Sequence, residues 1–192
     1  MRTAIFGGSF NPFHVGHLVI ADEILGSGLC GRILFVPAFL PPHKSIEDPG
    51  ARFRLAMVGR SIEEEEGLGV DDCEILRKGV SYSIDTISYL VEGEKVEPNP
   101  LLVIGDDLVG GFKKWKNPDA LLKVCEILIV HRRHDERIHT DFPHRYVDNP
   151  IIPISSTMVR DRILRGKPWR FLVPEGSRKV IEENGLYGIG TK

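Results

Sequence analysis

Two histidines three positions apart carry the clearest chemical signal in this sequence. His14 and His17 follow a glycine-rich turn, residues 7–12, which joins a short apolar strand to an amphipathic helix. The start of a helix offers unpaired N–H groups and roughly half a positive charge, so it attracts an anion. Imidazole donors placed there can stabilise negative charge that develops on a reacting phosphate. The pattern therefore predicts a site of nucleotidyl transfer.

The same residues also have an ordinary structural interpretation. Residues 7–12 are common turn chemistry, and a single histidine near a helix start is often a cap or a core residue. Their combination in one strand–turn–helix unit favours the functional interpretation. Gly7 and Gly8 then lack side chains where the backbone would approach a nucleotide.

A second group of donors lies near the carboxyl end of the chain. A helix is predicted over 156–165, and three hydroxyl residues stand at its start: Ser155, Ser156 and Thr157. Arg160 follows one turn later. Such a run is a sensible helix cap whatever the function. Because Arg160 would point back to the same helix start, the group favours a phosphate site.

Both groups resemble the signatures of one enzyme superfamily. Residues 7–18 resemble the His-x-Gly-His element of the nucleotidyltransferases, and residues 154–160 resemble their Ile-Ser-Ser-Thr-x-x-Arg element. Segments between them are similar, in the same order, to the bacterial-type nicotinate-nucleotide adenylyltransferases: residues 41–44 (PPHK), 81–86 (SYSIDT), 104–107 (IGDD) and Trp115. The resemblance covers nearly the whole chain.

This resemblance implies transfer of the adenylyl group of ATP to nicotinate mononucleotide, giving deamido-NAD and pyrophosphate in NAD biosynthesis. A nucleotide phosphate is already anionic at neutral pH, so its oxygen needs no general base. We expect in-line displacement by positioning and electrostatics, without a covalent intermediate. Mg²⁺ is expected to bind with ATP, held largely by phosphate oxygens and water, with few dedicated protein ligands. Asp107 is a candidate for a ribose or magnesium contact, and a helix N-cap is its structural alternative.

The resemblance also implies roles for individual residues. The catalytic residues would be His14, His17 and Arg160. The ATP-binding residues would be Gly7, Gly8, Ser9, Phe10, Gly16, Gly105, Asp107, Ser155, Ser156 and Thr157. The substrate-binding residues would be Lys44, Ser83 and Trp115. Gly16 would keep space for adenine or ribose, and Arg132 or Arg133 could reach the ATP.

Two other functions stay open at this stage. A different phosphate acceptor, nicotinamide mononucleotide or phosphopantetheine, would use the same chemistry, although residues 41–44, 81–86 and Trp115 favour nicotinate. A non-catalytic nucleotide-binding sensor would keep the fold without turnover, although both histidines and Arg160 are present. The histidine-rich run 131–139 lacks a recognised metal-ligand spacing, so no metal site is predicted there.

Bulk properties narrow the class of protein. The 192 residues, 42% of them hydrophobic, predict one domain over residues 1–192 with a sizeable core. A net charge of −2 indicates no extended nucleic-acid surface. No apolar run approaches the ~20 residues of a membrane span, and no secretory signal is evident. Three cysteines without a Cys-x-x-Cys spacing indicate reduced thiols. We expect a cytoplasmic protein without nucleic-acid or membrane partners, and a homo-oligomer is compatible with this composition.

Strand-like and helix-like segments alternate along the chain. The expected strands are near 2–7, 31–37, 70–76, 101–105, 126–130 and 151–154. The expected helices are near 15–26, 49–65, 83–92, 117–123, 156–165 and 174–184. The alternation predicts an α/β fold with a doubly wound, Rossmann-like parallel sheet. Its ligand would bind beyond the carboxyl ends of the strands.

Overall fold

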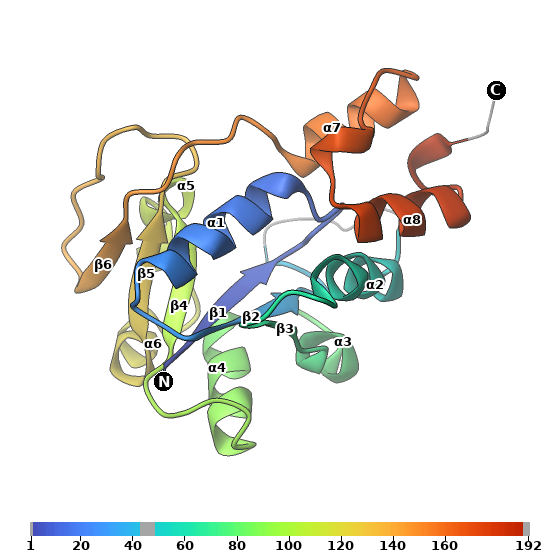
Figure 1. Cartoon of the computed structure of the whole chain (residues 1–192). Coiled ribbons are helices and arrows are strands. Elements are labelled where there is room, and N and C mark those ends of the chain that lie inside the picture. Colours follow the sequence, from blue (N-terminus) through green and yellow to red (C-terminus); the bar gives the residue numbers. More distant parts are fainter. Residues whose placement is uncertain (1, 43–48, 190–192) are drawn as a thin grey trace.

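A six-stranded sheet forms the centre of the structure, a computed structural model that describes residues 2–42 and 49–189 (Figure 1). Every neighbouring pair of strands is parallel, and the spatial order is β3-β2-β1-β4-β5-β6. The strands are β1 (Thr3–Gly8), β2 (Arg32–Pro37), β3 (Leu68–Val70), β4 (Leu101–Gly105), β5 (Glu126–Val130) and β6 (His144–Val147). The predicted doubly wound α/β fold is confirmed.

Helices connect the strands and cover both faces of the sheet (Figure 1). The α-helices are α1 (Val15–Gly26), α2 (Ala51–Ile62), α3 (Cys73–Arg77), α4 (Ser83–Glu92), α5 (Asp106–Val109), α6 (Pro118–Val124), α7 (Ser156–Leu164) and α8 (Glu175–Glu183). Three short 3-10 helices are η1 (Phe112–Lys114), η2 (Arg170–Leu172) and η3 (Leu186–Gly188).

Two apolar clusters, one on each face, hold these layers together. Alternate residues of β1 point to opposite faces, as the pleat requires: Ala4 and Phe6 join the cluster of α1, α2, α7 and α8. Ile5 joins the other cluster, with buried residues of α3, α4, α5 and α6. All five residues of β4 are buried, because a parallel sheet covered on both sides leaves no strand face to water.

The strand order reverses beside β1, and this decides where a ligand can bind. β1 lies between β2 and β4: the chain runs from β1 outward through β2 to β3 and then returns to β4 on the other side of β1. Such a switch point opens a crevice at the carboxyl ends of the strands. His14 follows the end of β1, and Asp107 follows the end of β4. The fold therefore brings the first motif and the 104–107 segment to the same edge.

Two expected strands are wrong in position. The third strand is Leu68–Val70 and not 70–76, because Asp71 accepts a hydrogen bond from the main-chain N–H of Cys73 (2.9 Å) and α3 begins there. The sixth strand is His144–Val147 and not 151–154. This edge strand is half exposed and mixes charged and apolar residues, so it lacks the continuous apolar run of a buried strand. In the described part of the chain, no helix is long and apolar enough to cross a membrane.

Candidate active site

His14 and His17 lie against each other at the start of α1. His14 is the N-cap, with an extended backbone, and the two rings stack with their centroids 3.7 Å apart. The main-chain N–H of His14 donates to Nδ1 of His17 (3.1 Å). Because Nδ1 of His17 accepts that hydrogen, a neutral His17 ring carries its proton on Nε2. His17 can therefore donate a hydrogen bond to a ligand.

Both imidazoles are held in the neutral form. Burial, and second the positive charge of Arg132, lowers the pKa of His14 to about 3. Burial also lowers the pKa of His17 well below its usual value, and His14 and Arg132 lower it further. At neutral pH these rings act as hydrogen-bond donors and not as cations. Nδ1 of His14 is buried with no hydrogen-bond partner among the residues described.

Aromatic rings hold His17 in place. Phe13 stacks on its far side with centroids 5.1 Å apart, and Phe10 meets its edge at 5.0 Å. Phe10 is only 2% exposed, so its side chain belongs to the core and only its main chain can reach a nucleotide. The imidazole of His17 is therefore oriented before any ligand arrives, which a preorganised donor requires.

The second motif lies directly on the loop that carries the first. Nη1 of Arg160 donates to the main-chain oxygen of Asn11 (2.7 Å), and the hydroxyl of Ser156 donates to the main-chain oxygen of Pro12 (2.9 Å). Figure 1 shows α7 beside the end of the loop from β1 to α1. The fold thus unites groups from opposite ends of the polypeptide in one site.

The other hydroxyls of this motif have local partners. Ser155 is the N-cap of α7 and accepts a hydrogen bond from the N–H of Met158 (3.2 Å), which is the structural role that such a run predicts. Thr157 accepts from Nη2 of Arg160 at 3.4 Å. A predicted ATP contact of Ser155 therefore competes with helix capping.

The space around the backbone differs among the glycines of the site. A Cβ on Gly7 would meet no described atom within 4 Å, so this backbone is open to a ligand. On Gly8 it would lie 2.8 Å from the ring of Phe10, and on Gly105 it would collide with Asp107 and Arg132. At Gly16 the ring of His14 fills the space, 3.1 Å from a Cβ. Gly16 therefore lets this imidazole pack against the start of the helix, and its contact with adenine or ribose stays a prediction.

The two aspartates after β4 make different contacts. Asp106 is 1% exposed and accepts hydrogen bonds from the main-chain N–H groups of Arg133 (3.1 Å) and His134 (2.9 Å). It therefore shapes the loop after β5. Asp107 lies 3.4 Å from Nη1 of Arg132. Arg132 is thus held near both histidines, where its charge affects them, whereas Arg133 contributes a main-chain contact.

The predicted substrate residues occupy neighbouring elements. Ser83 is the first residue of α4, and Trp115 follows η1, partly buried against Phe112 (centroids 5.3 Å apart). An ion pair joins the two elements, because Nζ of Lys116 lies 2.8 Å from the carboxylate of Asp85. The predicted residue Lys44 lies outside the described residues.

Titratable side chains do not gather as metal ligands in the part of the chain that the structure describes. The histidine-rich run folds its own loop. Nδ1 of His131 lies 2.7 Å from the main-chain oxygen of His134, and the main-chain N–H of His131 donates to Oδ1 of Asn149 (2.8 Å). The oxygens of Asp106 are occupied by main-chain donors.

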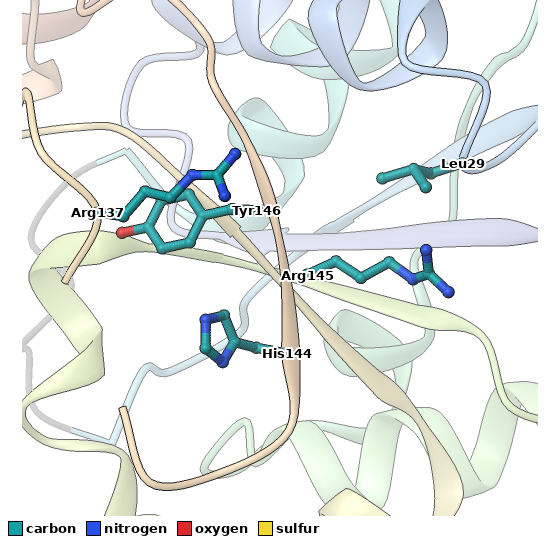
Figure 2. A pocket seen from close by; sticks show the side chains of 5 residues that line it. All are labelled: Leu29, Arg137, His144, Arg145 and Tyr146. Carbon is teal, nitrogen blue, oxygen red and sulfur yellow. The ribbon is translucent and has the colours of Figure 1, made fainter. Parts of the chain in front are cut away.

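A hollow of about 330 Å³ on the outer edge of the sheet lies apart from this constellation (Figure 2). It is lined by Leu29, Arg137, His144, Arg145 and Tyr146. Both arginines already have partners, Asp148 for Arg137 and Glu126 for Arg145. None of the predicted site residues lines the hollow, and we assign it no role in the chemistry.

Comparison with known proteins decides the family. The model of the cytidylyltransferase-like family matches residues 5–162. Over 190 residues the chain is 38% identical to a protein of Borrelia hermsii named "Probable nicotinate-nucleotide adenylyltransferase", covering 99% of this chain and 100% of the relative. The chain belongs to the nicotinate-nucleotide adenylyltransferase family. A Streptococcus pyogenes member is 36% identical, over 97% of this chain and 88% of the relative.

Solved structures show the same adenylyltransferase fold. A Plasmodium falciparum nicotinic acid mononucleotide adenylyltransferase, complexed with NaAD, superposes with a TM-score of 0.79. The match covers 99% of this chain and 98% of the other, at 19% identity. At that identity the agreement concerns the fold alone.

Two residues that support this adenylyltransferase site were not found from the sequence. Arg54 and Tyr187 both contact the loop before His14: Nη1 of Arg54 donates to the oxygen of Ser9 (2.8 Å), and the hydroxyl of Tyr187 donates to Asn11 Oδ1 (2.6 Å). The sequence does give one signal for Arg54. This charged residue lies on the same helix face as the apolar residues Met57 and Val58, three and four positions later. Tyr187 follows the last long helix and gives no such signal.

Proposed function

We propose that this chain transfers the adenylyl group of ATP to nicotinate mononucleotide, releasing pyrophosphate and forming deamido-NAD. Its membership of the nicotinate-nucleotide adenylyltransferases supports this reaction. The observation that carries it is the meeting of Arg160 with the loop before His14, because that contact unites donors from both motifs.

The reaction requires an oxygen of the mononucleotide phosphate to attack the α-phosphorus of ATP. The bond from that phosphorus to the bridging oxygen breaks, and pyrophosphate carries away the negative charge. Neutral imidazoles of His14 and His17 would stabilise charge on the transferred group by donating hydrogen bonds. Arg160 and the start of α7 would hold the phosphates that leave. No side chain has to remove a proton, since the attacking oxygen is already ionised.

ATP would enter this site as its magnesium complex. The ion would neutralise part of the charge on the phosphates and be held mainly by their oxygens and by water. Asp107 is the carboxylate that we propose as its protein contact, because it lies in α5 just after the end of β4 and is partly buried beside Arg132. In this arrangement Arg132 would pair with a phosphate once Asp107 faces the ion.

The nicotinate half would lie between Trp115 and the start of α4. Stacking of a pyridine ring on Trp115 is worth ~1–3 kcal/mol, by analogy with bases on aromatic side chains. The N–H groups at the start of α4 would donate hydrogen bonds to the carboxylate of nicotinate, and Lys116, paired with Asp85, lies beside them. An amide in place of the carboxylate would lose this attraction.

One experiment tests the reaction and its competitors together. Purified protein is given ATP, Mg²⁺ and, in turn, nicotinate mononucleotide, nicotinamide mononucleotide or phosphopantetheine, and pyrophosphate release is measured. We expect kcat/KM to be highest for nicotinate mononucleotide. A preference for the amide or for phosphopantetheine would overturn the substrate assignment. Binding of ATP with no pyrophosphate from any acceptor would favour a sensor.

A further inference from the structure

Arg54 is a fully buried cation that the proposed reaction does not use. Its side chain, on α2, is 0% exposed. Arginines are rarely buried completely unless they are paired. Among the described residues the recorded hydrogen bonds of Arg54 go to two main-chain oxygens and to no carboxylate, and its Nε is buried without a partner. Burial of such a group costs stability, so the contacts it makes need an explanation.

These contacts join two loops that are distant in the sequence. Nη1 donates to the oxygen of Ser9 (2.8 Å), in the loop that leads to His14. Nη2 donates to the oxygen of Phe39 (3.2 Å), just after β2. The nitrogens of a planar guanidinium have a fixed separation, so the two carbonyls are held at a set distance from each other. A movement of one loop is therefore transmitted to the other.

The second loop continues to the acceptor side of the site. The N–H of Phe39 donates to Oγ of Ser81 (3.0 Å), and the N–H of Ser81 donates to the oxygen of Leu40 (2.9 Å). Two residues later, Ser83 begins α4. Hydrogen bonds thus run from the loop beside the histidines, through Arg54, to the helix start that we propose for the nicotinate carboxylate.

We infer that Arg54 is a positioning residue that couples the binding of the two substrates, an inference that rests on the proposed function. A substrate that orders one loop removes part of the ordering cost for the other substrate. By thermodynamic linkage, each substrate then raises the affinity of the other by the same factor.

The test measures this factor without turnover. Binding of an ATP analogue with a methylene group in place of the α,β bridging oxygen, which cannot transfer its adenylyl group, is titrated with and without saturating nicotinate mononucleotide. In the natural protein we expect the mononucleotide to tighten analogue binding at least ~5-fold, the lower end of usual coupling factors. In Arg54→Lys the factor should fall to less than about twofold, because a single ammonium keeps the charge but lacks the planar fork that holds both carbonyls.

Two further variants make the test independent of whether Arg54→Lys folds. Ser81→Ala removes one of the two hydrogen bonds in the same connection, the one from the N–H of Phe39, without disturbing the buried cation. It should reduce the coupling factor, leaving binding of the analogue alone within about twofold, as expected for a partner distant from the ATP loop. Adding Ser81→Ala to Arg54→Lys should change the factor little, because both act on one connection. Arg60→Lys is the matched control, since Arg60 lies on the same helix and pairs with Glu183 at the exposed surface.

The outcomes separate this inference from the proposed function. Undiminished coupling in Arg54→Lys, or in Ser81→Ala if Arg54→Lys does not fold, overturns the role of Arg54, as does an absence of coupling in the natural protein. Failure of the natural protein to turn over nicotinate mononucleotide overturns the proposed function instead. Amide hydrogen exchange in the ligand-free protein then still tests Arg54. The lysine variant should exchange faster at both loops, 9–13 and 38–42, and a change in neither loop would overturn the connection.

Discussion

Nη1 of Arg160 lies 2.7 Å from the main-chain oxygen of Asn11, 149 positions earlier in the chain. This bond anchors the guanidinium against the loop before His14. The contact of Nη2 with Thr157 is longer, 3.4 Å, so N–H groups on that side are available to a phosphate. A cation that is ordered beforehand loses less conformational entropy when it binds.

Replacement of Arg160 by alanine should lower kcat at least ~10²-fold, as loss of one preorganised donor usually does. The free energy of unfolding should fall by only ~1.5–3 kcal/mol, the usual worth of a hydrogen bond from a charged group. Steady-state kinetics and chemical denaturation check the two effects. Arg165→Ala, at the exposed other end of α7, is the control and should resemble the natural protein in both. An unchanged kcat in folded Arg160→Ala would remove Arg160 from the catalytic residues.

His17→Ala should also lower kcat at least ~10²-fold, because the Nε2–H donor is lost. The fold should persist, although the contact with Phe13 is lost and some stability with it. Pyrophosphate release and near-ultraviolet circular dichroism measure the two effects. His144→Ala, on the edge strand β6, should keep normal kinetics. A folded His17→Ala with near-normal kcat would contradict the proposed donor role.

Trp115→Ala should weaken the binding of nicotinate mononucleotide and leave the binding of ATP almost unaffected. Loss of stacking worth ~1–3 kcal/mol corresponds to a dissociation constant roughly 5- to 150-fold higher. Isothermal titration with each ligand separately provides the measurement. Trp115→Phe keeps an aromatic face and should lie between the natural protein and the alanine variant. If the binding of both ligands weakens equally, Trp115 does not belong to the nicotinate mononucleotide site.

The low pKa of His14 predicts a dependence of stability on pH. Its pKa is about 3 in the folded chain and near the ordinary value of 6.5 when unfolded. Between these values the unfolded chain binds more protons, so the free energy of unfolding falls as the pH falls. Thermal midpoints at about pH 7 and about pH 5 should show this decrease, since this range lies above the usual pKa of carboxyl groups.

His14→Gln should reduce that decrease, because the titrating ring is gone. His139→Gln, in an exposed loop, is the matched control and should keep the natural dependence. An equal slope in the natural protein and in His14→Gln would show that His14 is not buried in its neutral form.

Short-range patterns predicted much of the fold and part of the site. The apolar runs of β4 and β5 and the turn before α1 were recognisable, because burial on both faces and helix starts leave clear residue patterns. The strand His144–Val147 was missed, since a half-exposed edge strand tolerates charged residues. The helix Cys73–Arg77 was missed because Val70 and its neighbours suggested a strand that continues.

The candidate site shows the same division. His14, His17 and Arg160 were recognisable by residue type and spacing. Arg54 and Tyr187 were not, because their importance comes from hydrogen bonds to Ser9 and Asn11 across the fold. The packing of the His14 ring against Gly16 was not recognisable either, since the direction of that ring depends on the packed loop.

The order of residues along this chain determined which chemical groups were available: imidazoles at a helix start, hydroxyls and an arginine at another, and apolar runs that must be buried. Tertiary structure alone decided that the two helix starts share one loop, that both imidazoles are neutral, and that a buried guanidinium joins Ser9 to Phe39. Residue type and local spacing set the donors and the helix boundaries. Distance, burial and desolvation depend on segments that approach one another only when the chain folds.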